Sequence, residues 1–120
     1  MAQTANKASL ANQKMCGDAA KAYFREHYGT GIEADIISTY TAHYNSRLNR
    51  CFIQTDITIT KTHARDVAVI DVFEEKSYGN LLKGPGGSLC QVYNAGLNDT
   101  VSCDNDETKF LDLAKALMSD

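Results

Sequence analysis

Five polar residues at one predicted turn are the best candidates for chemistry in this sequence. They are His43, Tyr44, Asn45, Arg47 and Asn49. Imidazole, phenol, amide and guanidinium groups can orient a polar ligand or contact a protein partner, and loops on a rigid scaffold often carry such sites. A structural interpretation competes with this one, because asparagine favours turns and short polar side chains bond to nearby backbone. The cluster is therefore a candidate binding site.

No motif for catalysis or metal binding accompanies this cluster. His27, His43 and His63 share no ligand spacing, so we predict no metal site and no cofactor. No serine lies in a GxSxG context. Asp56 and Asp71 would lie in strands, but nothing in the sequence brings these two acids together. We expect no catalytic residues; the alternative is a small hydrolase or ligand-processing enzyme that uses His43 with a nearby carboxylate.

Length and composition limit the possible classes of protein. The chain has 120 residues, 43% of them hydrophobic and 22% charged, which is typical of one folded globular domain. The net charge of −3 comes without a basic stripe, so we expect no nucleic-acid partner. No stretch approaches the roughly 20 apolar residues that span a bilayer, so we expect no membrane span.

The cysteines carry the strongest indication of cellular location. There are four, Cys16, Cys51, Cys90 and Cys103, and none forms a CxxC pair. Widely spaced cysteines in even number in a small domain predict two disulfides and an oxidising compartment, periplasmic or extracellular. The alternative is a cytosolic domain with four buried thiols. Residues 1–5 lack a leader sequence, and the cysteines favour an exported protein whose leader has been removed.

Three disulfide pairings are open to four cysteines, and the predicted elements favour one of them. Cys16 lies on the apolar stripe of a predicted helix, and Cys51 lies on the apolar face of a predicted strand. Cys90 and Cys103 flank a predicted hairpin. We therefore predict the bridges Cys16–Cys51 and Cys90–Cys103.

The pattern of apolar residues predicts the elements that position these groups. An apolar stripe predicts a helix over about residues 11–27, followed by Gly29 as its cap, and residues 1–10 are expected to be frayed. Alternation predicts a hairpin over 40–60, the run 67–73 suits a strand covered on both faces, and further strands are expected at 77–83, 88–93 and 100–103. Asp104 and Glu107 resemble a capping box that opens a final helix.

Short turns between the strands predict an antiparallel meander. We expect a single α+β domain over residues 11–120, in which an N-terminal helix precedes about five strands and a C-terminal helix follows them. Both helices are expected to pack on one face of the sheet.

One string resembles a known group of sequences. Tyr40, His43-Tyr44-Asn45, Leu48 and Cys51-Phe52 follow the cysteine-bearing helix, and this arrangement is similar to that of small exported bacterial proteins to which no activity is attached. The resemblance implies a periplasmic or envelope location and brings no catalytic residues. We expect a small disulfide-stabilised, non-enzymatic binding or accessory protein of the cell envelope with an envelope protein partner; the sequence leaves its oligomeric state open.

Overall fold

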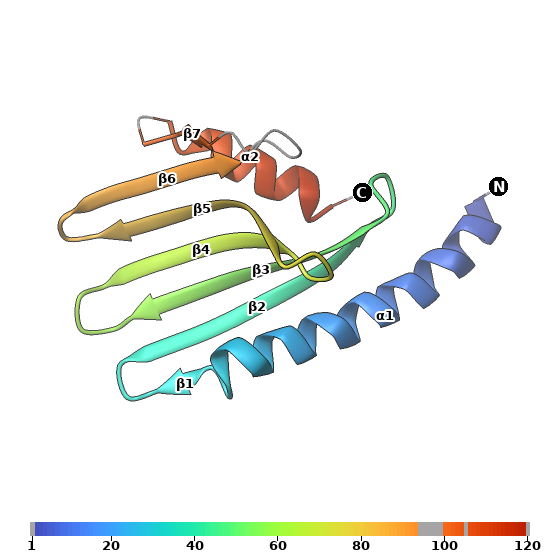
Figure 1. Ribbon diagram of the computed structural model, residues 1–120, viewed down its shortest axis with the longest axis horizontal. Coiled ribbons are helices and arrows are strands. Elements are labelled where there is room, and N and C mark those ends of the chain that lie inside the picture. The colour runs from blue at the N-terminus through green and yellow to red at the C-terminus, as the bar shows by residue number, and fades with distance from the viewer. Residues whose placement is uncertain (1, 94–99, 105, 120) are drawn as a thin grey trace.

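A seven-stranded antiparallel sheet with one helix on each side makes up the structure, a computed structural model that describes residues 2–93, 100–104 and 106–119 (Figure 1). The helices are α1 (Ala2–Tyr28) and α2 (Thr108–Leu117). The strands are β1 (Ile32–Glu33), β2 (Ile36–Asn45), β3 (Arg50–Ile59), β4 (Ala64–Asp71), β5 (Lys76–Gly84), β6 (Gly87–Tyr93) and β7 (Thr100–Ser102). Their order in the sheet is their order in the chain, which confirms the α+β class and the meander.

The expected count of about five strands is wrong, because the described part of the chain forms seven. The short strand β1 lies between the predicted helix and the predicted hairpin, where we expected no strand. It has two residues, paired with Ile36 and Ile37 of β2. Two residues are too few to show the alternation that indicates a strand in a sequence. At the other edge β7 adds three residues beside β6.

The expectation that both helices cover one face is also wrong. Neighbouring residues of a strand point to opposite faces, and Cys51 and Ile53 belong to the α1 core whereas Phe52 belongs to the α2 core. The α1 core also contains Phe24 and Tyr44. The sheet therefore separates two cores, one beneath each helix.

Strand β4 confirms the prediction of a strand buried on both faces. Val67 and Val69 pack in the α2 core, and Ile70 and the adjoining Val72 pack in the α1 core. A run of consecutive apolar residues suits this position because both faces are packed along residues 67–72.

Helix α1 begins at Ala2, whereas the sequence predicted a helix that begins at about residue 11. Cys16, Ala20 and Phe24 are buried against the sheet. The predicted cap is confirmed: Gly29 has a φ of 61°, and its N–H donates to the carbonyl of Arg25 at 3.0 Å. Across the described residues, neither helix combines the length and apolar character that a bilayer span requires.

Helix α2 confirms the predicted final helix and buries Phe110, Ala114 and Leu117, but the predicted capping box is wrong. The helix begins at Thr108, and Glu107 at its N-cap makes no side-chain capping bond. The Asp104 carboxylate instead accepts the Cys90 N–H at 2.6 Å, so it is used at the edge of the sheet.

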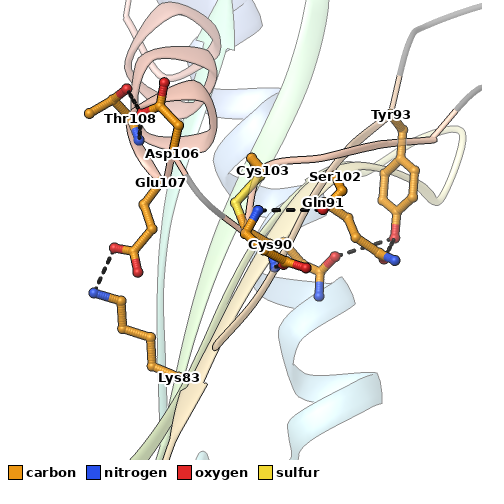
Figure 2. Close-up of a disulfide and its surroundings, with 11 residues drawn as sticks. Lys83, Cys90, Gln91, Tyr93, Ser102, Cys103, Asp106, Glu107 and Thr108 are labelled. Atoms are coloured by element: carbon orange, nitrogen blue, oxygen red, sulfur yellow. Dashed lines mark hydrogen bonds and ion pairs between the residues drawn. A yellow bond between two sulfur atoms is a disulfide. The ribbon is translucent and has the colours of Figure 1, made fainter. Parts of the chain in front are cut away.

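Both predicted disulfides are confirmed, and no described cysteine is free. The Cα atoms lie 5.4 Å apart in Cys16–Cys51 and 4.8 Å apart in Cys90–Cys103. The first ties α1 to β3. The second ties β6 to the segment that leads into α2 (Figure 2).

Each helix covers only part of its face. Helix α1 packs mainly on β2 and β3, whereas α2 packs mainly on β5 and β6 (Figure 1). Each face of the sheet therefore has a half that no described helix covers.

Candidate functional site

Asn45, one of the five predicted site residues, is fully buried and holds the turn to the end of α2. Its amide nitrogen lies 3.2, 3.1 and 3.2 Å from the carbonyl oxygens of Ala116, Leu117 and Ser119. Its amide oxygen accepts the Leu48 N–H at 3.0 Å. These bonds satisfy carbonyls that the last turn of a helix leaves unpaired, so this side chain is committed to the fold.

Three further members of the cluster also make bonds within the protein. Arg47, which is exposed, donates from Nη2 to the Ala116 carbonyl at 2.9 Å. The Tyr44 hydroxyl donates to the amide oxygen of Asn49, which has a left-handed φ of 54°. The β2–β3 turn is therefore held rigid by its own side chains.

His43 lies apart from Tyr44. It pairs with Phe52 in the β2–β3 register, so its side chain is on the α2 face, whereas Tyr44 packs in the α1 core. The structure thus brings Tyr44 together with Asn49, and Asn45 together with Arg47, but it does not bring all five residues to one point. That they bind a ligand, or that His43 works with a carboxylate, stays a prediction.

A second polar cluster centres on Arg50, which sequence reasoning missed. Its Nη1 lies 2.9 Å from Asp71 Oδ2 and 2.5 Å from Glu74 Oε1. Asp71 is buried, and its Oδ1 accepts the N–H groups of Phe73 and Glu74 at 3.0 and 3.1 Å. The hydrogen bonds that Arg50 donates to Glu74 and then to Asp71 raise its pKa, so it remains a guanidinium ion.

Exposed apolar side chains surround this ion pair. A shallow pocket of about 220 Å³ has among its lining residues Met15 from α1, Tyr44 from β2, Asn49 from the β2–β3 turn, and Arg50, Phe73 and Glu74. Phe73 is 59% exposed and Met15 is 52% exposed. We call these six residues the Arg50 surface. Arginine, methionine and aromatic residues are enriched at protein interfaces.

The Cys16–Cys51 disulfide assembles the Arg50 surface. Met15 precedes Cys16 and Arg50 precedes Cys51, so the bridge brings their backbones together. The Val72 N–H donates to the Cys51 carbonyl at 2.9 Å, which places the Asp71–Glu74 segment beside them. The signal available in the sequence was the position of Met15 and Arg50 next to two cysteines that were predicted to pair.

The histidines lie in different parts of the fold. His63 is in the β3–β4 turn, at a φ of 59°, and His43 is near the opposite end of the strands. His27 has Glu26 and Glu75 as neighbours, with ligand atoms within 4.8 Å of one another, and all three residues are exposed. Exposed groups of this kind are common without a metal, so they do not single out a metal centre.

The two strand acids are each held by a different arginine. Asp56 accepts two hydrogen bonds from Arg65 Nε, at 3.0 and 3.2 Å, and Asp71 pairs with Arg50. They occupy different positions along the β3–β4 ladder, where Phe52 is opposite Asp71 and Asp56 is opposite Val67. The structure does not bring them together as an acid pair.

Comparison of the chain with protein-family models, with curated proteins and with solved structures found no match.

Proposed function

We propose that this protein is a small, disulfide-stabilised, non-enzymatic binding or accessory protein of the bacterial cell envelope, and that it contacts an envelope protein through the Arg50 surface. The observation that carries the proposal is the exposure of Phe73 and Met15 around a fixed arginine. Two disulfides indicate an oxidising environment. The periplasmic or secreted location is part of the proposal, and the Tyr40–Phe52 string supports it.

Rigidity favours a binding role for this surface. A side chain that is immobilised on binding costs roughly 0.5–1.5 kcal/mol, and a surface that is already fixed avoids part of this cost. The disulfide fixes the backbone next to Met15 and Arg50, and the two N–H bonds to Asp71 fix the turn that carries Phe73. The backbone that carries the two exposed apolar side chains is thus held in one arrangement.

Charge indicates what the partner must supply. Arg50 is paired with two carboxylates, so the cluster of Arg50, Asp71 and Glu74 carries a net negative charge. Glu74 is the accessible acid because Asp71 is buried. We expect a partner that places an apolar side chain against Phe73 and a hydrogen-bond donor or cation beside Glu74.

The test is capture from a bacterial envelope extract on the immobilised oxidised protein, followed by affinity measurement with the purified captured protein. We expect saturable binding, and we expect Phe73→Ser to weaken it at least tenfold. The matched control is Leu111→Ser, because Leu111 is an equally exposed apolar residue on α2. The absence of any saturable partner, or equal losses in the two variants, would refute the proposal.

A further inference from the structure

One half of the α1 face of the sheet is not covered by either helix, because α1 lies over β2 and β3. Two rows of side chains cross this half on β4, β5 and β6. The register places Asp66 opposite Leu82 and Leu82 opposite Leu89; in the next row Ala68 is opposite Asn80 and Asn80 is opposite Gln91. We call these six residues the open face; Ala68 marks its border, because it also packs against the α1 core.

The first row of the open face is apolar around a single carboxylate. Leu82 is 39% exposed and Leu89 is 42% exposed, and they lie opposite each other in adjacent strands. Both line a hollow of about 410 Å³ that continues over Ala64 and the β5–β6 turn. A group of neighbouring aliphatic side chains exposed on a sheet indicates a contact surface, whereas single exposed aliphatic residues are common on any protein.

Asp66 is the polar group in this row, and its charge is not compensated. Its Oδ1 is buried and has no hydrogen-bond partner among the described residues. The nearest cations along the strands point to the other face: Arg65 bonds to Asp56 at 2.5 Å, and Lys83 bonds to Glu107 at 2.7 Å (Figure 2). A buried carboxylate oxygen without a partner is costly, so a cation brought to this site would be stabilising.

The uncovered half of the other face differs in its chemistry. On the α2 side of β2 and β3 the exposed or half-buried residues include Thr39, Thr41 and Gln54, together with the exposed Ile37 near one end of β2. The acid there, Asp56, is already paired with Arg65. Asp56 is thus already neutralised within the protein, whereas Asp66 on the open face is not.

We propose that the open face docks a segment of a partner protein that carries one lysine or arginine between aliphatic side chains. The cation binds the Asp66 carboxylate, and the aliphatic groups pack on Leu82 and Leu89. Tyr93 donates its hydroxyl to the amide oxygen of Gln91 at 2.9 Å, which leaves that amide nitrogen as a donor toward the segment (Figure 2). A second copy is the wrong occupant, because a twofold contact centred here would bring two Asp66 carboxylates together.

The probes that test this are two synthetic capped peptides. One has a central lysine flanked by leucines and threonines, and its twin has glutamate in place of the lysine. Binding is followed through the backbone amide signals of the isotope-labelled, oxidised protein. We expect saturable shifts confined to the open face with the lysine peptide, and at least tenfold weaker binding of the glutamate peptide.

Variants identify the groups that bind. Asp66→Asn is expected to lower the affinity for the lysine peptide about tenfold. The double variant Leu82→Ser, Leu89→Ser is expected to abolish binding of this peptide. The matched control is Asp56→Asn, which removes a carboxylate from the opposite face and should leave the affinity unchanged. Phe73→Ser should also leave it unchanged, which separates this surface from the Arg50 surface.

Three results would overturn the inference. They are the absence of saturable shifts with the lysine peptide, equal affinities for the two peptides, and a dimer in light scattering that Leu82→Ser and Leu89→Ser dissociate. Misfolding is distinguished from lost binding by thermal unfolding of each variant, and Asp66→Asn is expected to be at least as stable as the parent protein.

Discussion

Asn45 shows how a single side chain can join two distant parts of this chain. Its amide satisfies carbonyls at the end of α2 and the Leu48 N–H of its own turn at the same time. The residue is fully buried, so water cannot replace these bonds if the side chain is removed. Asparagine indicated a turn in the sequence, but the carbonyls that it satisfies lie about 70 residues away and left no local pattern.

Replacement of Asn45 tests this role at the residue scale. We expect Asn45→Ala to lower the free energy of unfolding by about 2–3 kcal/mol, because buried carbonyls and an N–H lose their partner. Arg47→Ala removes a bond to the same Ala116 carbonyl from the exposed side, and we expect it to cost less than about 1 kcal/mol. Urea unfolding of both variants makes the comparison. Equal losses would show that the buried amide has no special role.

The charge of Asp66 should make stability depend on pH. Burial raises its pKa above the ordinary 3.8, so the folded state holds this proton more tightly than the unfolded state does. Stability from this group is therefore lost as the pH rises from 3.8 through the folded pKa. We expect Asp66→Asn to unfold at a higher temperature than the parent at pH 7, with a difference that shrinks as the pH falls toward 3.8.

Thermal unfolding from pH 3 to pH 7 measures this difference, with Asp56→Asn as the control. Asp56 is paired with Arg65, so its replacement should not stabilise the protein at pH 7. A parent protein that is more stable than Asp66→Asn at neutral pH would show that Asp66 has a favourable partner, which would also weaken the case for the open face.

At the scale of the elements, the sequence predicted most of what local pattern can reveal. The stripe in α1, the final helix and the run in β4 were all confirmed. The placement of the helices was not predicted, although the burial of β4 on both faces requires a layer on each side. Cys51 and Phe52 are adjacent and both apolar, so their side chains point to opposite faces of β3. This pair also indicated that both faces of the sheet are covered.

The candidate site was predictable only in part, because local sequence patterns do not show which distant segments come together. The β2–β3 turn is local and its residues were found from the sequence. The Arg50 surface depends on which carbonyl pairs with Val72 and on where α1 crosses β3. Both depend on tertiary contacts between segments far apart in the chain, which leave no local signal.

Close approach of α2 to β5 requires a glycine. A Cβ added at Gly79 would lie 3.0 Å from the Gln91 carbonyl oxygen and 3.2 Å from Phe110 Cδ1. We expect Gly79→Ala to lower stability by about 1–3 kcal/mol, the usual cost of overpacking. The matched control is Gly84→Ala in the same strand, where the nearest atom is Cβ of Ala64 at 3.7 Å. Chemical unfolding should show little or no loss for this control, and an equal loss in both variants would contradict the packing described for Gly79.

At the scale of the whole molecule, each of the two cores has its own covalent cross-link. Cys16–Cys51 lies in the α1 core, and Cys90–Cys103 lies in the α2 core. In the chain-entropy model, closing loops of these two lengths contributes about 4 and about 3 kcal/mol. Small cores bury a limited apolar area, so cross-links of this size are a large share of the stability of such a domain.

The disulfides also connect stability with the proposed function. One bridge positions the Arg50 surface, and both indicate the oxidising environment in which an envelope protein works. The open face lies where α1, fixed over β3 by the first bridge, leaves β4 to β6 uncovered. Both proposed binding surfaces therefore depend on the same covalent frame.

Disulfide mapping of the native protein tests this frame most directly. The protein is alkylated while still oxidised, digested without reduction, and analysed by mass spectrometry. We expect cross-linked peptides that join Cys16 to Cys51 and Cys90 to Cys103, with no alkylated cysteine. Four alkylated cysteines, or peptides that join Cys16 to Cys90 or Cys103, would contradict the packing of α1 on β3 and the oxidising location together.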